Sequence, residues 1–186
     1  MSILLEGTDN SGKTTLSKDL RQLNPHLQYH HSGSRPSTDE HERLCLEQQH
    51  ALLAMGNTIV DRATCISEQV YRPDRLFEVK LMQHVDLLLQ IGVIIVYCRP
   101  STDKLMSFEK FTWRGEESED FKQGVLQNQH IYIQRYDELM TRVPHLAYDY
   151  EDEMASAWLR KMLAESSFDQ LTYLRLHEVM MKAILK

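Results

Sequence analysis

The sequence has few of the residues and patterns that are typical of a secreted protein, of a protein stabilised by a structural metal ion, or of a membrane-spanning protein. Its 186 residues include three cysteines, an odd number with no C-x-x-C spacing, which argues against a disulfide framework or a zinc site. No apolar run approaches the roughly 18 residues of a membrane span, and the longest covers residues 92–98. No basic segment precedes the first apolar stretch, so we expect no signal peptide and a cytoplasmic protein.

Positive charge is also scarce. The chain carries 27 acidic and 21 basic side chains, for a formal net charge of -6. Proteins that coat a phosphate backbone usually carry a basic stripe, so bulk nucleic-acid binding is disfavoured. A small phosphorylated ligand is not excluded, since it needs only a few local cations and backbone donors. The length and the 42% hydrophobic content predict one compact domain with its own core.

Short β-branched runs alternate with longer helical patterns along the chain. The pattern predicts strands over residues 2–6, 26–31, 57–61, 93–98 and 145–148. It predicts helices over residues 13–23, 38–55, 74–90, 119–142, 151–164 and 168–185, and a charged, irregular segment over 101–118. This order indicates an α/β fold with a five-stranded parallel sheet and helices on both faces. Ligands of such sheets bind at the carboxyl ends of the strands.

One motif follows the first strand directly. Residues 7–14 read G-x-x-x-x-G-K-T, the pattern of a phosphate-binding P-loop in its required strand–loop–helix context. Glycines let successive N–H groups point inward, and the helix adds its positive N-terminal end. We expect Lys13 to reach the β and γ phosphates of ATP and the Thr14 hydroxyl to hold Mg²⁺. The expected ATP-binding residues are Asn10, Ser11, Gly12, Lys13, Thr14 and Thr15.

A P-loop alone leaves the reaction open among GTPases, motor ATPases and small-molecule kinases. Outside the P-loop itself, the sequence has no D-x-x-G after a strand and no N-K-x-D before a late helix, as a GTPase would carry, and the chain is short for a motor ATPase. Asp61 ends the apolar run over residues 58–61, so it emerges at the sheet edge near the phosphates. There it can organise Mg²⁺ or accept a proton from the nucleophile, and Arg62 beside it can clamp a second anion.

Four further patterns, in order along residues 1–160, resemble thymidylate kinases. They are the run 5–9 leading into the P-loop, Arg35-Pro36, Asp61-Arg62 with Ser67 and Tyr71 downstream, and residues 113–117 followed by Phe121. The resemblance implies the three-layer P-loop kinase fold over residues 1–165, with a lid over about 101–118. Residues 166–186 then form a C-terminal helical extension that packs on the domain or helps to form a dimer.

The resemblance also implies roles for individual side chains. Asp9 would touch the sugar 3′-hydroxyl of the phosphate acceptor, and Arg35 and Arg62 would hold its 5′-phosphate. Asn10 stands where some thymidylate kinases carry an arginine, so the transition-state cation would come from Arg114 in the lid. The remaining acceptor-binding candidates are Ser67, Tyr71 and, on the helix over 38–55, Arg43.

Together these patterns predict a deoxynucleoside monophosphate kinase that uses ATP and Mg²⁺, with Lys13, Asp61, Arg62 and Arg114 as catalytic residues. The resemblance implies a homodimer. Arg35-Pro36 lacks the acid and glycine of the family's motif, and Ala63 replaces an aromatic residue, so the base stays open, modified pyrimidines included. The alternatives are a deoxynucleoside kinase, a kinase of a modified base in DNA, and a non-catalytic nucleotide-binding regulator.

Overall fold

Strands and helices alternate along the chain in the computed structural model, which describes residues 1–32, 38–73, 81–107 and 119–165. The strands are β1 (Ser2–Glu6), β2 (Gln28–His31), β3 (Thr58–Asp61), β4 (Val93–Cys98) and β5 (Leu146–Tyr148). The helices are α1 (Lys13–Leu23), α2 (Asp39–Ala54), α3 (Thr64–Tyr71), α4 (Leu81–Gln90), α5 (Thr102–Leu105), α6 (Glu119–Met140) and α7 (Glu153–Ala164).

The five strands form one parallel sheet in the order β2-β3-β1-β4-β5. The predicted α/β fold is therefore confirmed. Strands β1, β3 and β4 are buried at every position, as expected for strands that are covered on both faces. Leu5 lies opposite Asp61 in the register, so the carboxyl ends of β1 and β3 are neighbours. The loop after β1 therefore begins beside the Asp61-Arg62 pair.

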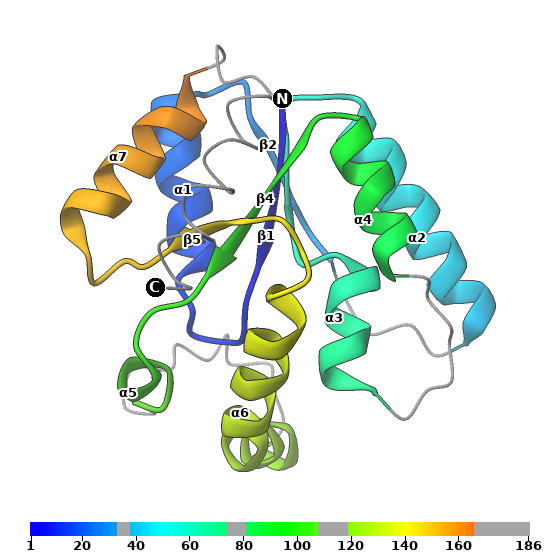
Figure 1. The fold of residues 1–186 in the computed structure, drawn as a ribbon, viewed down its shortest axis with the longest axis vertical. Helices are drawn as coiled ribbons and strands as arrows, with labels where there is room; N and C mark the ends of the chain where they lie inside the picture. The colour runs from blue at the N-terminus through cyan, green and yellow to red at the C-terminus, as the bar shows by residue number, and fades with distance from the viewer. Residues whose placement is uncertain (33–37, 74–80, 108–118, 166–186) are drawn as a thin grey trace.

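Helices cover both faces of the sheet (Figure 1). Helices α1 and α7 pack on one face around the side chains of Leu16, Leu20, Leu159 and Leu163. Helices α2, α3, α4 and α6 pack on the other face, with Leu53, Ile66, Val85 and Tyr136 among their buried residues. The two cores form the three-layer arrangement that was expected, and they fix the strand ends from which the loops emerge.

The observed elements match most of the expected ones to within a few residues, and β1, β4 and α1 have the expected bounds. Helix α3 was not expected. The N–H of Ala63, which precedes its first turn, donates to the Glu6 carboxylate at 2.5 Å, and this contact spans 57 residues of sequence. Helix α5 lies in the segment 101–118 that was expected to be irregular.

Several predictions lie outside the described residues. They concern Arg35, Arg114, most of the lid, the first part of the helix over 74–90, and the extension over 166–186. Within the ranges that the structure describes, none of the helices combines the length and the apolar character that crossing a bilayer requires.

Candidate active site

The loop after β1 has the backbone that its glycines predict. Gly7 and Gly12 have φ angles of 138° and 87°, which L side chains rarely adopt. A Cβ at Gly7 would lie 2.5 Å from the carbonyl oxygen of Cys98, and one at Gly12 would lie 2.7 Å from Cδ1 of Tyr150. Neither neighbour leaves room for a methyl group. Glycine is therefore required at both positions for conformation and for space.

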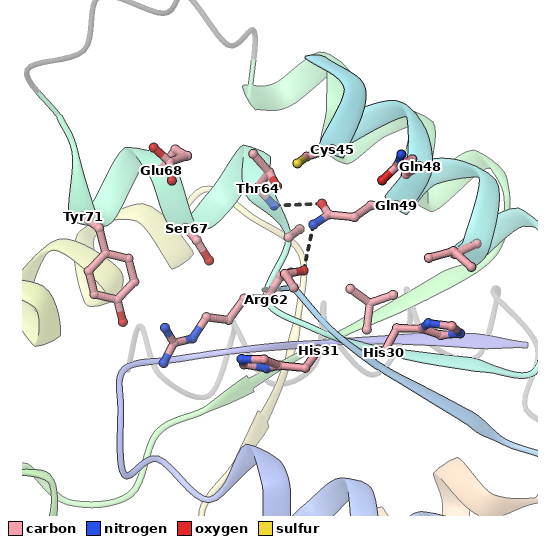
Figure 2. Close-up of a pocket in the computed structure, with 14 residues that line it drawn as sticks. His30, His31, Cys45, Gln48, Gln49, Arg62, Thr64, Ser67, Glu68 and Tyr71 are labelled. Carbon is pink, nitrogen blue, oxygen red and sulfur yellow. Dashed lines mark hydrogen bonds between the residues drawn. The ribbon is translucent and has the colours of Figure 1, made fainter. Parts of the chain in front are cut away.

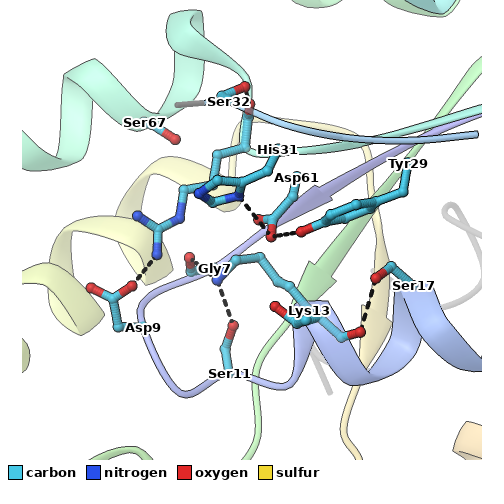
Figure 3. A network of polar contacts seen from close by, with 12 residues as sticks. Gly7, Asp9, Ser11, Lys13, Ser17, Tyr29, His31, Ser32, Asp61 and Ser67 are labelled. Carbon is cyan, nitrogen blue, oxygen red and sulfur yellow. Dashed lines mark hydrogen bonds and ion pairs between the residues drawn. The ribbon is translucent and has the colours of Figure 1, made fainter. Parts of the chain in front are cut away.

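Lys13 is the first residue of α1, and its buried side chain reaches into this loop. Its Nζ donates to Gly7 O at 2.8 Å and to Thr8 O at 2.6 Å. It also donates to Ser11 Oγ at 3.1 Å (Figure 3). Burial lowers the pKa of Lys13, and the nearby Arg62 charge lowers it further, whereas the Asp61 and Asp9 carboxylates oppose this shift. The ammonium is thus already positioned inside the loop.

The other predicted ATP-binding residues surround Lys13. Thr14 and Thr15 are exposed on the first turn of α1, whose N-terminal end faces the loop. Asn10 has a φ of 63°, and its side-chain amide donates to Lys104 O at 3.3 Å. The loop and the segment after β4 are therefore linked at the edge where a donor nucleotide would enter.

Asp61 is almost fully buried at the end of β3. Its Oδ2 accepts the Tyr29 hydroxyl at 2.8 Å and lies 3.3 Å from Nδ1 of His31 (Figure 3). Burial alone would raise the pKa of Asp61, but the His31 hydrogen bond and the Lys13 and Arg62 charges hold it well below its usual range. Asp61 is thus an anion beside the P-loop.

The donor set at this edge fits a magnesium ion. Asp61 Oδ1 is buried and has no hydrogen-bond partner among the described residues. The Thr14 hydroxyl is exposed beside Lys13. Mg²⁺ prefers oxygen ligands and keeps several waters, so one hydroxyl, one carboxylate and phosphate oxygens suit it.

Arg62 connects the strand end to the P-loop. Its guanidinium forms an ion pair with Asp9 and lies 5.4 Å from the centre of the Tyr71 ring. Its Nε is buried without a hydrogen-bond partner in the described part of the chain. Burial tends to raise the pKa of Asp9, but the Arg62 and Lys13 charges outweigh that effect and lower it. Asp9 and Arg62, which were both predicted to bind the acceptor, therefore form a charged pair with each other.

A cavity of about 230 Å³ opens at the ends of β2 and β3 (Figure 2). Residues from these strands and from α2 and α3 line it: His30, His31, Ser32, Cys45, Gln48, Gln49, Leu52, Val60, Arg62, Ala63, Thr64, Ser67, Glu68 and Tyr71. It brings together the predicted residues Arg62, Ser67 and Tyr71. Arg43 is not among the lining residues, and its exposed side chain pairs with Glu47 at 3.1 Å along α2.

Buried polar residues that were not predicted from the sequence also stand at this site, among them Glu6 and Gln129. Glu6 accepts the Ala63 N–H at 2.5 Å and the Tyr136 hydroxyl at 3.0 Å, and burial raises its pKa to about 7. Gln129 of α6 donates to Asp9 O at 3.0 Å and to Thr8 Oγ1 at 3.3 Å. Glu6 could have been found from the sequence, because it is a charged residue that ends an apolar strand just before the P-loop. No local sequence pattern points to Gln129.

No protein-family model matches the chain, and no curated protein matches it either. Solved structures do resemble it. The YorR protein from Bacillus subtilis, in complex with phosphorylated GDP, matches with a TM-score of 0.54 and 17% identity, over 100% of this chain and 96% of that one. Deoxyadenosine kinase from M. mycoides, with bound dATP, matches with a TM-score of 0.52 and 18% identity, over 89% of this chain and 100% of that one.

At such identities the likeness concerns the fold. The chain has the three-layer α/β fold of the P-loop kinases, with its P-loop at the carboxyl end of β1.

Proposed function

We propose that the chain is an ATP-dependent kinase that transfers the γ-phosphate to the 5′-phosphate of a deoxynucleoside monophosphate, with a pyrimidine or modified pyrimidine as its base. The observation that carries the proposal is the position of Arg62. Its guanidinium stands in the wall of the cavity, is tied to Asp9 of the P-loop, and keeps a buried Nε–H without a partner among the described residues. An acceptor that is already phosphorylated needs such a cation.

The likeness to a deoxyadenosine kinase with bound dATP supports nucleotide chemistry on this fold. The P-loop would hold the donor, with Lys13 at its β and γ phosphates, and the cavity would hold the acceptor. Catalysis of phosphoryl transfer depends mostly on alignment and on neutralising charge. Lys13 and Arg62 would act on the donor and acceptor phosphates, respectively. Arg35 and Arg114 would add cations from the acceptor and lid sides.

Bound Mg²⁺ would supply further neutralisation of the transferred phosphoryl charge, held by the Thr14 hydroxyl and by Asp61. Asp9 would orient the sugar 3′-hydroxyl while it keeps Arg62 in place. Ser67 and Tyr71 line the cavity beside Arg62 and would contact the acceptor.

One observation favours a second candidate, a deoxynucleoside kinase. His31 lines the cavity, and its Nδ1 faces the buried Asp61 carboxylate at 3.3 Å. With its proton directed to Asp61, the ring presents Nε2 as a hydrogen-bond acceptor. Such an acceptor suits a 5′-hydroxyl, which must lose a proton during transfer, better than it suits a phosphate.

Release of ADP from ATP, measured over a panel of deoxynucleosides and their monophosphates with canonical and modified bases, tests the proposal. We expect turnover with a monophosphate. Turnover with free nucleosides alone would replace the leading function with the second candidate, and turnover with neither would refute both. Arg62→Gln should raise the KM for the monophosphate, whereas Arg142→Gln, which changes an exposed arginine just after α6, should not.

A further inference from the structure

Arg62 has a backbone conformation that residues other than glycine rarely adopt. Its φ of 70° lies in the left-handed region, which is strained for residues other than glycine. Such residues persist only where their surroundings fix them, and they cluster at functional sites. Two hydrogen bonds fix this one: the Arg62 N–H donates to Leu5 O at 2.9 Å, and the Ser32 hydroxyl donates to Arg62 O at 2.5 Å.

Gln49 of α2 is a buried residue that lines the cavity and contacts Ser32. Its Oε1 accepts the Thr64 N–H at 2.8 Å, and its Nε2 lies 2.7 Å from Ser32 Oγ (Figure 2). A backbone N–H can only donate, so the oxygen of the Gln49 amide must face Thr64 and its NH₂ must face Ser32. Gln49 thus joins the start of α3 to the residue that follows β2.

The directions of these hydrogen bonds form a chain. A serine hydroxyl has one proton and can accept a second hydrogen bond. Because the Gln49 NH₂ donates to Ser32, the single proton of Ser32 is directed to the Arg62 carbonyl. Only a side chain with a donor and an acceptor on one planar group serves both Thr64 and Ser32. A carboxylate of the same shape lacks the donor.

We propose that Gln49 is a positioning residue that holds Arg62 in its left-handed conformation and thereby aims its guanidinium at Asp9 and the cavity. Asp9 and Tyr71 hold the side chain of Arg62, whereas Gln49 and Ser32 hold its backbone. The proposal rests on the proposed function where it takes the acceptor phosphate as the group that Arg62 binds. In this proposal, α2 supplies the residue that keeps the Arg62 guanidinium in position to bind the acceptor phosphate.

The variant Gln49→Glu tests the chain of donors. The carboxylate still accepts the Thr64 N–H, but it offers Ser32 no proton and competes with Arg62 O as the stronger acceptor. We expect the KM for the monophosphate to rise about tenfold, while the dissociation constant for ATP changes less than about twofold. In a crystal structure of the unliganded variant, Arg62 should leave the left-handed region. That readout needs no substrate, so it tests the positioning role even if the proposed function fails.

Two further variants provide an independent test and a matched control. Ser32→Ala removes the last link to Arg62 without a new charge, and it should reproduce the acceptor-side KM effect even if Gln49→Glu does not fold. Gln83→Glu makes the same chemical change at an exposed position of α4, and it should leave both constants unchanged. Left-handed Arg62 in the crystals of Gln49→Glu or Ser32→Ala would overturn the proposal. An equal loss of ATP and acceptor binding would do the same.

Discussion

The variant Glu6→Gln should change how the stability of this fold depends on pH. Glu6 is fully buried at the end of β1, and burial raises its pKa from 4.5 to about 7, against the opposing effect of the Ala63 N–H. The folded chain therefore holds the Glu6 proton more tightly than the unfolded chain does. Stability is lost as the pH rises from about 4.5 to about 7, and the full loss amounts to about 3 kcal/mol.

Glutamine keeps an acceptor for the Ala63 N–H but cannot ionise, so this pH term vanishes in the variant. Urea unfolding of both proteins, at several pH values from about 4 to about 8, isolates the contribution of Glu6 as a difference. Relative to the wild type, Glu6→Gln should gain about 3 kcal/mol across that range. Glu138→Gln, which alters an exposed carboxylate of α6, should show no such trend. A pH-independent difference for Glu6→Gln would refute the reasoning.

Two other substitutions address the P-loop. Lys13→Met should lower kcat at least about a hundredfold and leave the fold intact. Lys18→Met, on the exposed side of the same helix, should leave kcat unchanged. ADP release measures kcat and circular dichroism checks the fold, and retained turnover in Lys13→Met would contradict the mechanism. Gly12→Ala should abolish ATP binding in calorimetry, because the added methyl would meet Tyr150 at 2.7 Å. Gly92→Ala, which strains a similar φ in open space, should cost only about 1 kcal/mol of stability and should not affect binding.

The fold could be predicted because its signals are local. The apolar run over 93–98 and the glycines and lysine of the P-loop each define their element without reference to the rest of the chain. The site could be predicted only in part. Asp61 and Arg62 stand at and just after the end of a strand, which is a local signal, whereas Gln49 and Gln129 act through contacts with residues distant in sequence. Arg43 illustrates the opposite case, since its i,i+4 spacing from Glu47 on a predicted helix is a local signal of the surface ion pair that the structure shows.

The charges of the described site bear on how an acidic chain would bind a phosphorylated ligand. Lys13 directs its ammonium to three acceptors of its own loop, and Arg62 is paired with Asp9. A phosphate that enters must therefore take the Lys13 ammonium from its internal partners, whereas the Arg62 Nε–H has none among the described residues. The binding free energy of the phosphate includes the loss of those internal hydrogen bonds. Because Asp9 and Asp61 largely balance the two cations at a distance, the described part of the site does not attract anions over a long range. Selectivity for nucleotides then has to come from close geometry: the loop amides, the ammonium and the guanidinium whose backbone Ser32 and Gln49 hold.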